Sequence, residues 1–187
     1  MAIAAVEAHH WSRDEYQRLA SSGLLPPGQK MELIDGIIYD MAAQNSLHAT
    51  GYRLVEEALR ETFPKGSGFE VRGQLPLDLS DISMPEPDAA VVQGSIRDFR
   101  DQHPRTAVLV VEVADSSLLH DRKRKIPLYA RSGIQEYWIL NLVRRTLEVY
   151  RDPQGEVYRT RTILRTGDMV SPLARPDAVL AVSDLLP

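Results

Sequence analysis

The stretch Ala-Val-Leu-Val-Val-Glu-Val-Ala, residues 107–114, decides the fold. It is too short for a helix and has no polar face, so it predicts a strand buried inside a sheet. A second run of this kind, Pro-Asp-Ala-Ala-Val-Val, occupies residues 87–92. Each run carries one carboxylate, Glu112 in the first and Asp88 in the second. An acidic side chain in a buried strand has to be compensated, because burying an unpaired charge is costly.

The nature of that compensation is the main clue to function. Two carboxylates about 4 Å apart repel by roughly 4 kcal/mol at an effective dielectric constant of about 20. Either one of them takes up a proton, or a cation lies between them. A divalent metal held by strand-borne carboxylates is the core of many phosphoryl-transfer sites.

Each carboxylate also has a plain structural alternative. Asp88 follows Pro87, which belongs at a strand entrance, so we expect Asp88 at the margin of the sheet, where a ligand can reach it. An Asp in an ordinary bend is the alternative. Glu112 shares one strand face with Val110 and Ala114, so it needs a metal, an Arg or Lys partner, or an exposed edge.

The order of the remaining elements indicates the fold class. The Asp35-Gly36 pair predicts a β-hairpin over residues 31–41. Helical spacing of apolar residues predicts a helix at 45–62, and further helices are expected at 12–20 and 121–132. Strands are expected at 69–77, 88–93, 107–114, 136–142, 146–151, 156–164 and 178–182. This order predicts an α/β or α+β fold with a mixed sheet.

Composition limits the class of protein. The chain has 187 residues, of which 43% are hydrophobic, which suits one domain over residues 1–187. Within it we expect an N-terminal helix and loop (1–30), a core (31–151), and C-terminal strands with a tail (152–187). The absence of cysteine excludes disulfides and thiolate metal sites and fits a reducing cytoplasm. We expect no signal peptide and no membrane span, because the first residues lack a basic segment and no apolar run approaches about 20 residues.

Charge is distributed unevenly along the chain. The net charge is −4, but residues 120–165 hold 11 Lys and Arg against 5 Asp and Glu, which gives this segment +6 and leaves −10 for the rest. A basic side on an acidic body could accept a polyanion locally. The alternative is that the arginines are simply solvated surface.

Lys125 is a candidate for chemistry because Asp121, Lys125 and Tyr129 recur at helical spacing on one face. A surface ion pair worth under about 0.5 kcal/mol is the ordinary interpretation. The sharper interpretation is a lysine that points at a metal site and stabilises developing negative charge. Pro127 removes a helical hydrogen bond unless the helix begins near Lys125.

Two further residues are weaker candidates. His48 lies in the apolar stripe of the helix at 45–62, so it faces either the core or a site, and a satisfied core histidine is the alternative. Glu32 lies at the start of the hairpin. Three roles are open for it: a cap, a partner for an arginine, or a residue that lines the same site. His9 and His10 point in opposite directions if extended, which disfavours a metal site there.

Taken together, these pieces resemble the Uma2 family, a bacterial group assigned to the PD-(D/E)xK, restriction endonuclease-like superfamily. The pieces are Glu32-Leu-Ile-Asp-Gly36, His48, Pro87-Asp88, Val111-Glu112-Val113, Asp121-x-x-x-Lys125-x-x-x-Tyr129 and Gly133-Ile-Gln-Glu-Tyr-Trp138. They run from about Met31 to Arg151. The resemblance implies a mixed central β-sheet flanked by helices.

The resemblance also implies a set of site residues. Asp88 and Glu112 would bind Mg²⁺ (or Mn²⁺), and the backbone carbonyl of Val113 would complete the metal shell. The superfamily places a lysine two residues after the glutamate, where this chain has Ala114. The family takes its lysine from the following helix, which here is Lys125.

The resulting hypothesis is a cytoplasmic, Mg²⁺-dependent endonuclease acting on DNA phosphodiesters. Lys125 would orient water or stabilise charge, Glu32 would ligate a second metal or orient the first, and His48 would contact phosphate or support Glu32. The alternative is a non-catalytic binding or interaction protein that keeps the nuclease fold, and a third possibility is hydrolysis of a smaller phosphoester. The strands at 146–151 and 156–164 would mediate a homodimer, since twofold dimers are the commonest assembly.

Overall fold

The structure is a computed structural model that describes residues 7–24, 28–41 and 43–187. The segment at 1–6, on which the expectation of no signal peptide rests, lies outside the described residues. Residues 25–27, in the N-terminal region expected to hold a helix and a loop (1–30), lie outside them as well.

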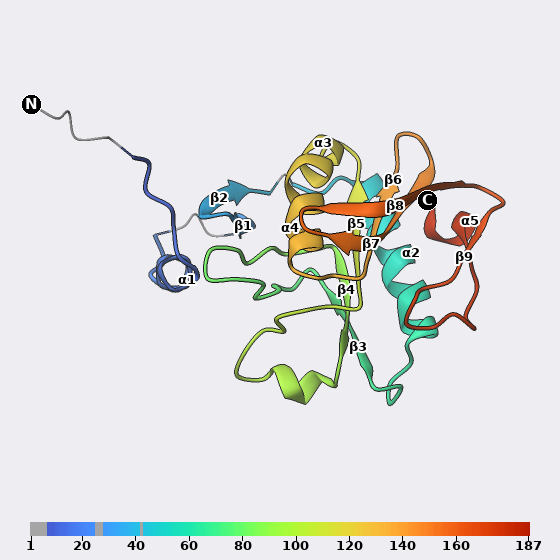
Figure 1. Cartoon of the computed structure of the whole chain (residues 1–187), viewed down its shortest axis with the longest axis horizontal. Helices are drawn as coiled ribbons and strands as arrows, with labels where there is room; N and C mark the ends of the chain where they lie inside the picture. Colours follow the sequence, from blue (N-terminus) through green and yellow to red (C-terminus); the bar gives the residue numbers. More distant parts are fainter. Residues whose placement is uncertain (1–6, 25–27, 42) are drawn as a thin grey trace, which may run out of the picture.

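A six-stranded sheet forms the centre of the molecule (Figure 1). Its strands lie in sequence order across the sheet: β3 (Phe69–Gly73), β4 (Ala89–Gln93), β5 (Leu109–Ala114), β6 (Glu136–Asn141), β7 (Thr146–Gln154) and β8 (Val157–Arg165). All neighbours are antiparallel except β5 and β6, which are parallel. The expected mixed sheet is therefore confirmed.

The central strand β5 is apolar on both sides because a helix covers each face of the sheet. Val111 and Val113 pack into a core that includes residues of α2 (Ser46–Thr62). Val110 and Ala114 pack into a second core with residues of α4 (Ile126–Arg131). A strand covered on both faces reads as a continuous apolar run, which explains the sequence of residues 107–114.

The connection from β5 to β6 carries the helical residues of the site. Parallel neighbours require a crossover, and this one contains α3 (Leu118–His120), the π-helical turn η2 (Asp121–Lys125) and α4. The single helix expected at 121–132 is therefore wrong in its start and in its regularity. Pro127 fits because it lies in the first turn of α4, where its missing N–H has no helical acceptor to lose. Gly133, with φ of +74°, ends the helix as expected.

Several other boundaries differ from expectation. β3 stops at Gly73 rather than residue 77, because Gln74 has a φ of +50° and its N–H bonds the carbonyl of Asp88. The β7–β8 hairpin is longer than expected and leaves only a two-residue turn. The strand expected at 178–182 is the short β10 (Leu180–Ala181), which pairs with β9 (Met169–Val170) and leads into α5 (Val182–Leu185). The charged stretch at 95–105 contains one 3₁₀ turn, η1 (Ile96–Phe99).

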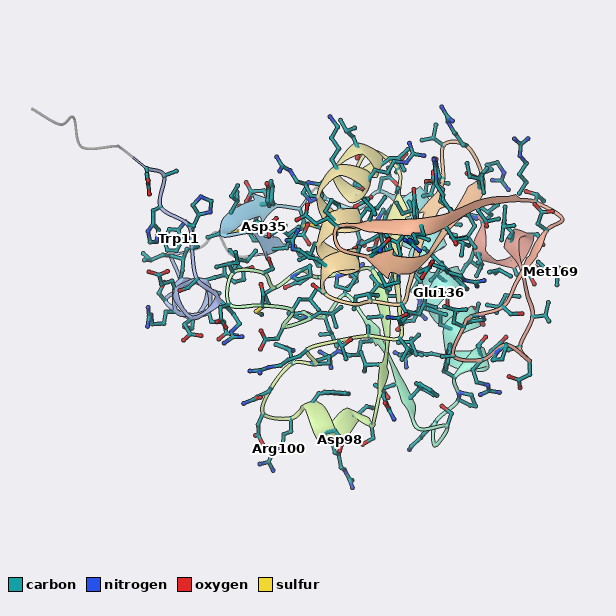
Figure 2. The ribbon with its side chains drawn as sticks, viewed as in Figure 1. Trp11, Asp35, Asp98, Arg100, Glu136 and Met169 are labelled. Atoms are coloured by element: carbon teal, nitrogen blue, oxygen red, sulfur yellow. The ribbon has the colours of Figure 1, made fainter. Side chains whose placement is uncertain are left out.

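An N-terminal unit lies to one side of the central sheet (Figure 1). It contains α1 (Arg13–Ser21), β1 (Met31–Ile34) and β2 (Ile37–Asp40). Asp35 and Gly36 have φ values of 53° and 75°, which confirms the predicted tight turn. Figure 2 shows Trp11 and Asp35 on this side of the molecule, and Asp98 and Arg100 together on the loop around η1.

Within the described residues, no helix combines the length and apolar character that crossing a membrane requires.

Candidate active site

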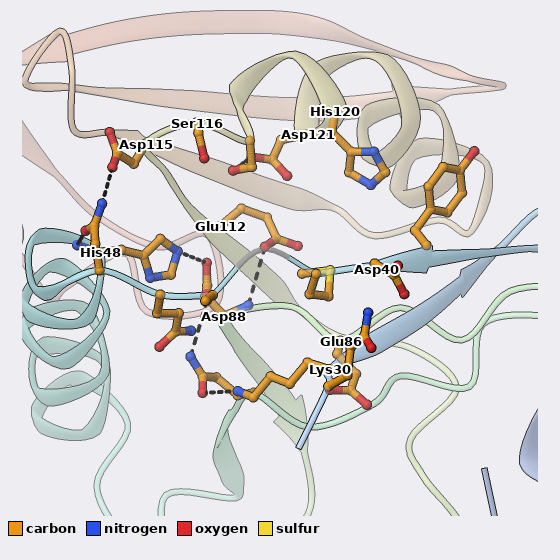
Figure 3. A pocket seen from close by; sticks show the side chains of 18 of the residues that line it. Lys30, Asp40, His48, Glu86, Asp88, Glu112, Asp115, Ser116, His120 and Asp121 are labelled. Carbon is orange, nitrogen blue, oxygen red and sulfur yellow. Dashed lines mark hydrogen bonds and ion pairs between the residues drawn. The ribbon is translucent and has the colours of Figure 1, made fainter. Parts of the chain in front are cut away.

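A cleft of about 610 Å³ opens beside the start of β4 and the end of β5 (Figure 3). The N-terminal end of α2 and the crossover helices contribute to its wall. Titratable side chains dominate the lining: Lys30, Asp40, His48, Glu86, Asp88, Glu112, Asp115, His120, Asp121 and Lys125. Most of these are acidic, so the cleft attracts cations before it attracts anions.

The antiparallel pairing of β4 and β5 brings the two predicted carboxylates together. Ala89 lies opposite Val111, which places Asp88 beside Glu112. The Val113 N–H donates to Asp88 Oδ2 at 2.8 Å, and the Asp88 N–H faces Glu112 Oε2 at 3.4 Å. Each carboxylate thus contacts a backbone N–H of the other strand or its flank. These two contacts fix the relative position of the pair.

Glu112 is buried, with 3% of its surface exposed, and its two oxygens have different surroundings. Oε1 accepts hydrogen bonds from Lys125 Nζ and from the Tyr129 hydroxyl, both at 2.9 Å. Within the described part of the chain, Oε2 has only the long contact with the Asp88 N–H. Oε1 therefore bonds side chains of η2 and α4, and Oε2 faces Asp88.

Lys125 reaches the site because the π-helical turn η2 carries it inward, and only 1% of its surface is exposed. Its ammonium also lies 3.3 Å from Glu32 Oε2 and 3.9 Å from Asp121 Oδ1. Burial opposes the charge, but Glu112, Glu32 and Asp121 outweigh it and raise the pKa of Lys125 well above its usual range. The ammonium is thus permanently charged at neutral pH.

Glu32 lies on β1 and has no exposed surface. Its Oε1 lies 3.1 Å from His120 Nε2, and its Oε2 accepts from the Glu86 N–H at 3.3 Å besides contacting Lys125. Burial alone would raise the pKa of Glu32, but Lys125 and His120 outweigh it and lower that pKa. Glu32 is therefore an ionised carboxylate behind the cleft wall.

His48 lies in the first turn of α2, whose N-cap Asn45 accepts from the His48 N–H at 2.9 Å. Its Nε2 is 3.3 Å from Asp88 Oδ2, and this contact raises the pKa of His48 against the opposing effect of burial. Its Nδ1 is buried and has no hydrogen-bond partner among the described residues. His48 therefore faces the site rather than the core and contacts Asp88, not Glu32.

The site has more negative than positive charge. Burial raises the pKa of Glu112 well above its usual range, and Asp121, Asp88 and Glu32 add to the rise although Lys125 opposes it. Burial likewise raises the pKa of Asp121. Burial is the main cause of both shifts and Lys125 opposes it, and a bound cation beside these carboxylates would oppose it further.

The donor set fits a hard divalent cation, since carboxylate and carbonyl oxygens are its preferred ligands. In the described part of the chain, however, no three His, Cys, Asp or Glu side chains converge as a ready metal-binding group. A cation held by Asp88 and Glu112 would thus need backbone, water or substrate oxygens to complete its shell, which is usual for Mg²⁺.

The fold brings together residues from five separate elements or their flanks: His48, Asp88, Glu112 and Lys125 line the cleft, and Glu32 lies behind its wall. Val113 also joins the site, through its N–H. His9 lies elsewhere, 3.6 Å from Glu15. Sequence reasoning missed the contact of His120 with Glu32, because the two residues are 88 positions apart. Tyr129 was marked only by its spacing from Lys125, and nothing in the sequence shows that its hydroxyl reaches Glu112.

The chain is similar to known proteins in two comparisons. The model of the family Uma2, described as "Putative restriction endonuclease", matches residues 13–183. The fold is similar to that in the crystal structure of "a putative nuclease belonging to DUF820 from Anabaena variabilis ATCC 29413", with a TM-score of 0.72 and 17% sequence identity. That similarity covers 93% of this chain and 96% of the other. No curated protein matches.

Proposed function

The chain belongs to the Uma2 family, and from its site we propose that it is a metal-dependent endonuclease that hydrolyses DNA phosphodiester bonds. One observation carries the proposal. Asp88 and Glu112 are fixed side by side in a cleft, with the Lys125 ammonium hydrogen-bonded to Glu112. Two carboxylates and a lysine at one point are the groups that metal-assisted phosphoryl transfer requires.

The proposed metal ligands are Asp88, Glu112 and the backbone carbonyl of Val113, with Mg²⁺ or Mn²⁺ as the ion. When bound, such an ion neutralises charge on the phosphate and lowers the pKa of a bound water. The unequal surroundings of the Glu112 oxygens support this assignment, because Oε1 is taken by two donors and Oε2 is left toward Asp88.

The remaining side chains act on the substrate and on the ligands. Lys125 holds a fixed positive charge at Glu112, where it can orient the attacking water and stabilise charge on the phosphate oxygens. His48 contacts Asp88 through Nε2 and helps to position that carboxylate. A cleft lined by acidic groups admits a phosphate only together with a cation, which supports metal-dependent rather than metal-free hydrolysis.

DNA would be held beside the cleft by its backbone. Lys123 and Arg124 are exposed on the outer side of η2, directly next to the inward-pointing Lys125. Arg144 and Arg145 are exposed on the β6–β7 turn. Contacts of this kind position a nucleic acid without reading its sequence.

We also propose a homodimer in the cytoplasm, where a DNA substrate is available. The β7–β8 hairpin supports the dimer, because β8 is the edge of the sheet and is exposed along most of its length. Light scattering at high concentration checks this part, and a single monomeric species would contradict it.

The test is cleavage of plasmid and branched DNA with Mg²⁺ or Mn²⁺. We expect the wild type to cut only with metal, and D88N and E112Q to lose cutting. E57Q removes one exposed carboxylate on α2 away from the cleft lining and is the matched control. Cutting that survives in D88N or E112Q would refute the assigned ligands.

The second candidate is a binding protein that keeps the nuclease fold without catalysis. Ala114 at the usual lysine position and the net charge of −4 favour it. In that case calorimetry shows no affinity for Mn²⁺, and Asp88→Ala raises stability, because it removes one carboxylate from an over-charged cluster.

A further inference from the structure

The geometry points to a site that accepts one divalent cation, because the Lys125 ammonium fills the position that a second cation would take and Glu32 holds it there. We infer that Glu32 is a positioning residue for Lys125, not a metal ligand. The inference rests on the proposed function, since it concerns the same metal site. It revises the role that the sequence suggested for Glu32.

The Lys125 ammonium lies close to three carboxylates. Lys125 Nζ lies 2.9 Å from Glu112 Oε1, 3.3 Å from Glu32 Oε2 and 3.9 Å from Asp121 Oδ1. These carboxylates come from β5, β1 and η2. Three carboxylates around one position favour a positive charge there. Here a covalently attached cation is already there.

Glu32 is buried, and protein groups contact both of its carboxylate oxygens. Its surface is fully buried, and it is not among the described residues that line the cleft. Both oxygens have protein partners, Oε1 with His120 and Oε2 with the Glu86 N–H and Lys125. Glu32 has no oxygen directed at the open cleft, so it acts on the reaction through Lys125.

Asp88 and Glu112 differ from Glu32 in their access to the cleft. Asp88 and Glu112 both line the cleft. Among contacts with the described residues, Glu112 Oε2 has only a 3.4 Å backbone contact, and Asp88 Oδ1 has only a 3.5 Å contact with Gln74. Two weakly occupied oxygens on neighbouring strands leave room for one cation. The carboxylates deeper in the site already have the Lys125 ammonium as their cationic partner.

The experiment is a calorimetric titration with Mn²⁺ alone. We expect one Mn²⁺ per wild-type chain, an affinity in E32Q close to that of the wild type, and a loss of at least about tenfold in D88N. Cleavage by E32Q should fall while Mn²⁺ binding does not. If Glu32 had only a structural role, the cleavage rate and the Mn²⁺ affinity of E32Q would fall together. E57Q is the control for loss of a carboxylate elsewhere.

Two further variants test the position of the ammonium itself. K125M removes the charge at similar length, so we expect it to bind a second Mn²⁺ among Glu112, Glu32 and Asp121. The double variant E32Q/K125M should lose that second ion. If K125M does not fold, the stoichiometry of the wild type and the affinity of E32Q still decide the matter.

The outcomes separate this inference from the proposed function. Two Mn²⁺ ions per wild-type chain, or an E32Q affinity as low as that of D88N, would overturn the inference and leave a metal-dependent nuclease standing. Absence of any Mn²⁺ binding by the wild type would remove the proposed function and the inference together.

Discussion

At the scale of single residues, Glu112 is the junction of the site, because its two oxygens serve different groups. Lys125 and Tyr129 both donate to Oε1, and Oε2 faces Asp88. Lys125 and Tyr129 therefore orient the carboxylate through Oε1, and Oε2 is the oxygen proposed to bind the metal beside Asp88. This division of roles makes Lys125 and Tyr129 separable by mutation.

For Lys125 we expect K125M to lower the cleavage rate by about 10²–10³-fold, the usual effect of removing one charge-stabilising group. Mn²⁺ binding should persist, because Asp88 and Glu112 remain. Single-turnover cleavage together with calorimetry checks both quantities. Loss of metal binding along with activity would show that Lys125 acts by holding the ligands rather than on the substrate.

Tyr129→Phe should lower the free energy of unfolding by about 1 kcal/mol, because it removes one buried hydrogen bond without a cavity. The phenol is buried, and burial together with Glu112 raises the pKa of Tyr129 well above its usual range. It is thus a neutral donor at every working pH. Denaturant unfolding measures the change, and Tyr39→Phe, on a half-buried tyrosine of β2, is the control.

The residues open to prediction from sequence are those that break a local rule. Glu112 interrupts an apolar strand, and Asp88 follows a proline at a strand entrance, so each stands out without a structure. His120 breaks no rule, and its contact with Glu32 spans 88 positions. Partner identity at such distances depends on the tertiary fold, which local pattern does not contain.

At the scale of elements, the crossover helices join the site to the β7–β8 hairpin through one buried carboxylate. Glu148 on β7 bonds Arg122 of η2 and Arg161 of β8, and it accepts from the Tyr150 hydroxyl at 2.6 Å. Lys125 lies on the same turn as Arg122. The Glu148 cluster therefore helps to fix the turn that carries the lysine.

The pH dependence of stability follows from Glu148. Burial raises its pKa, but Arg122, Tyr150 and Arg161 outweigh burial and lower it below the ordinary value of 4.5. The stabilisation is therefore present above that ordinary value and is lost as pH falls through the lower folded pKa. E148Q should lower the free energy of unfolding by about 2–3 kcal/mol at pH 7.

As the pH falls from 4.5 through the lower folded pKa of Glu148, the difference between E148Q and wild type should shrink, because the wild-type carboxyl then becomes protonated too. Denaturant unfolding at several pH values measures it. A difference that stays constant with pH would contradict the assignment. E156Q, on the exposed hairpin turn, is the matched control.

The packing of α2 depends on a glycine. A Cβ at Gly51 would lie 3.1 Å from Leu142 Cδ2 and 3.2 Å from Val113 Cγ1, so the helix lies close to β5. Gly51→Val should lower stability by about 1–3 kcal/mol through overpacking, and it should weaken cleavage because α2 carries His48. Thermal unfolding and cleavage check the two effects, and unchanged values in both would contradict the close packing.

The elements differ in how far sequence determines them. The Asp35-Gly36 hairpin and α2 follow from turn chemistry and helical periodicity, which are local. The π turn at Asp121–Lys125 does not, because a five-residue turn with four basic side chains is stabilised by its contacts with Glu112, Glu32 and Glu148. Strand β3 also ended earlier than its pattern, at the φ of Gln74.

At the scale of the whole molecule, an acidic cleft lies beside exposed basic residues. Lys123 and Arg124 are exposed on the turn whose other face carries Lys125 into the cleft. The resemblance predicted a family core from 31 to 151, whereas the family match covers residues 13–183. The N-terminal helix and the last strands thus belong to the family fold, although no single motif there marks them.

DNA binding should depend on this basic side. K123A/R124A should weaken binding and reduce the slope of log affinity against log salt by about 2, since each lost phosphate contact lowers it by roughly 1. Fluorescence anisotropy over a salt series measures it. R97A/R100A, on the loop around η1, removes equal charge elsewhere (Figure 2). Equal effects of the two pairs would indicate a bulk charge effect.

In the proposed function, Asp88 and Glu112 hold a divalent cation with which this cleft cuts DNA. The most direct measurement is nicking of supercoiled plasmid by wild type and E112Q, first in EDTA and then as Mg²⁺ is added. We expect no nicking in EDTA, nicking by the wild type that rises with Mg²⁺, and none by E112Q. Nicking in EDTA, or equal nicking by E112Q, would contradict it.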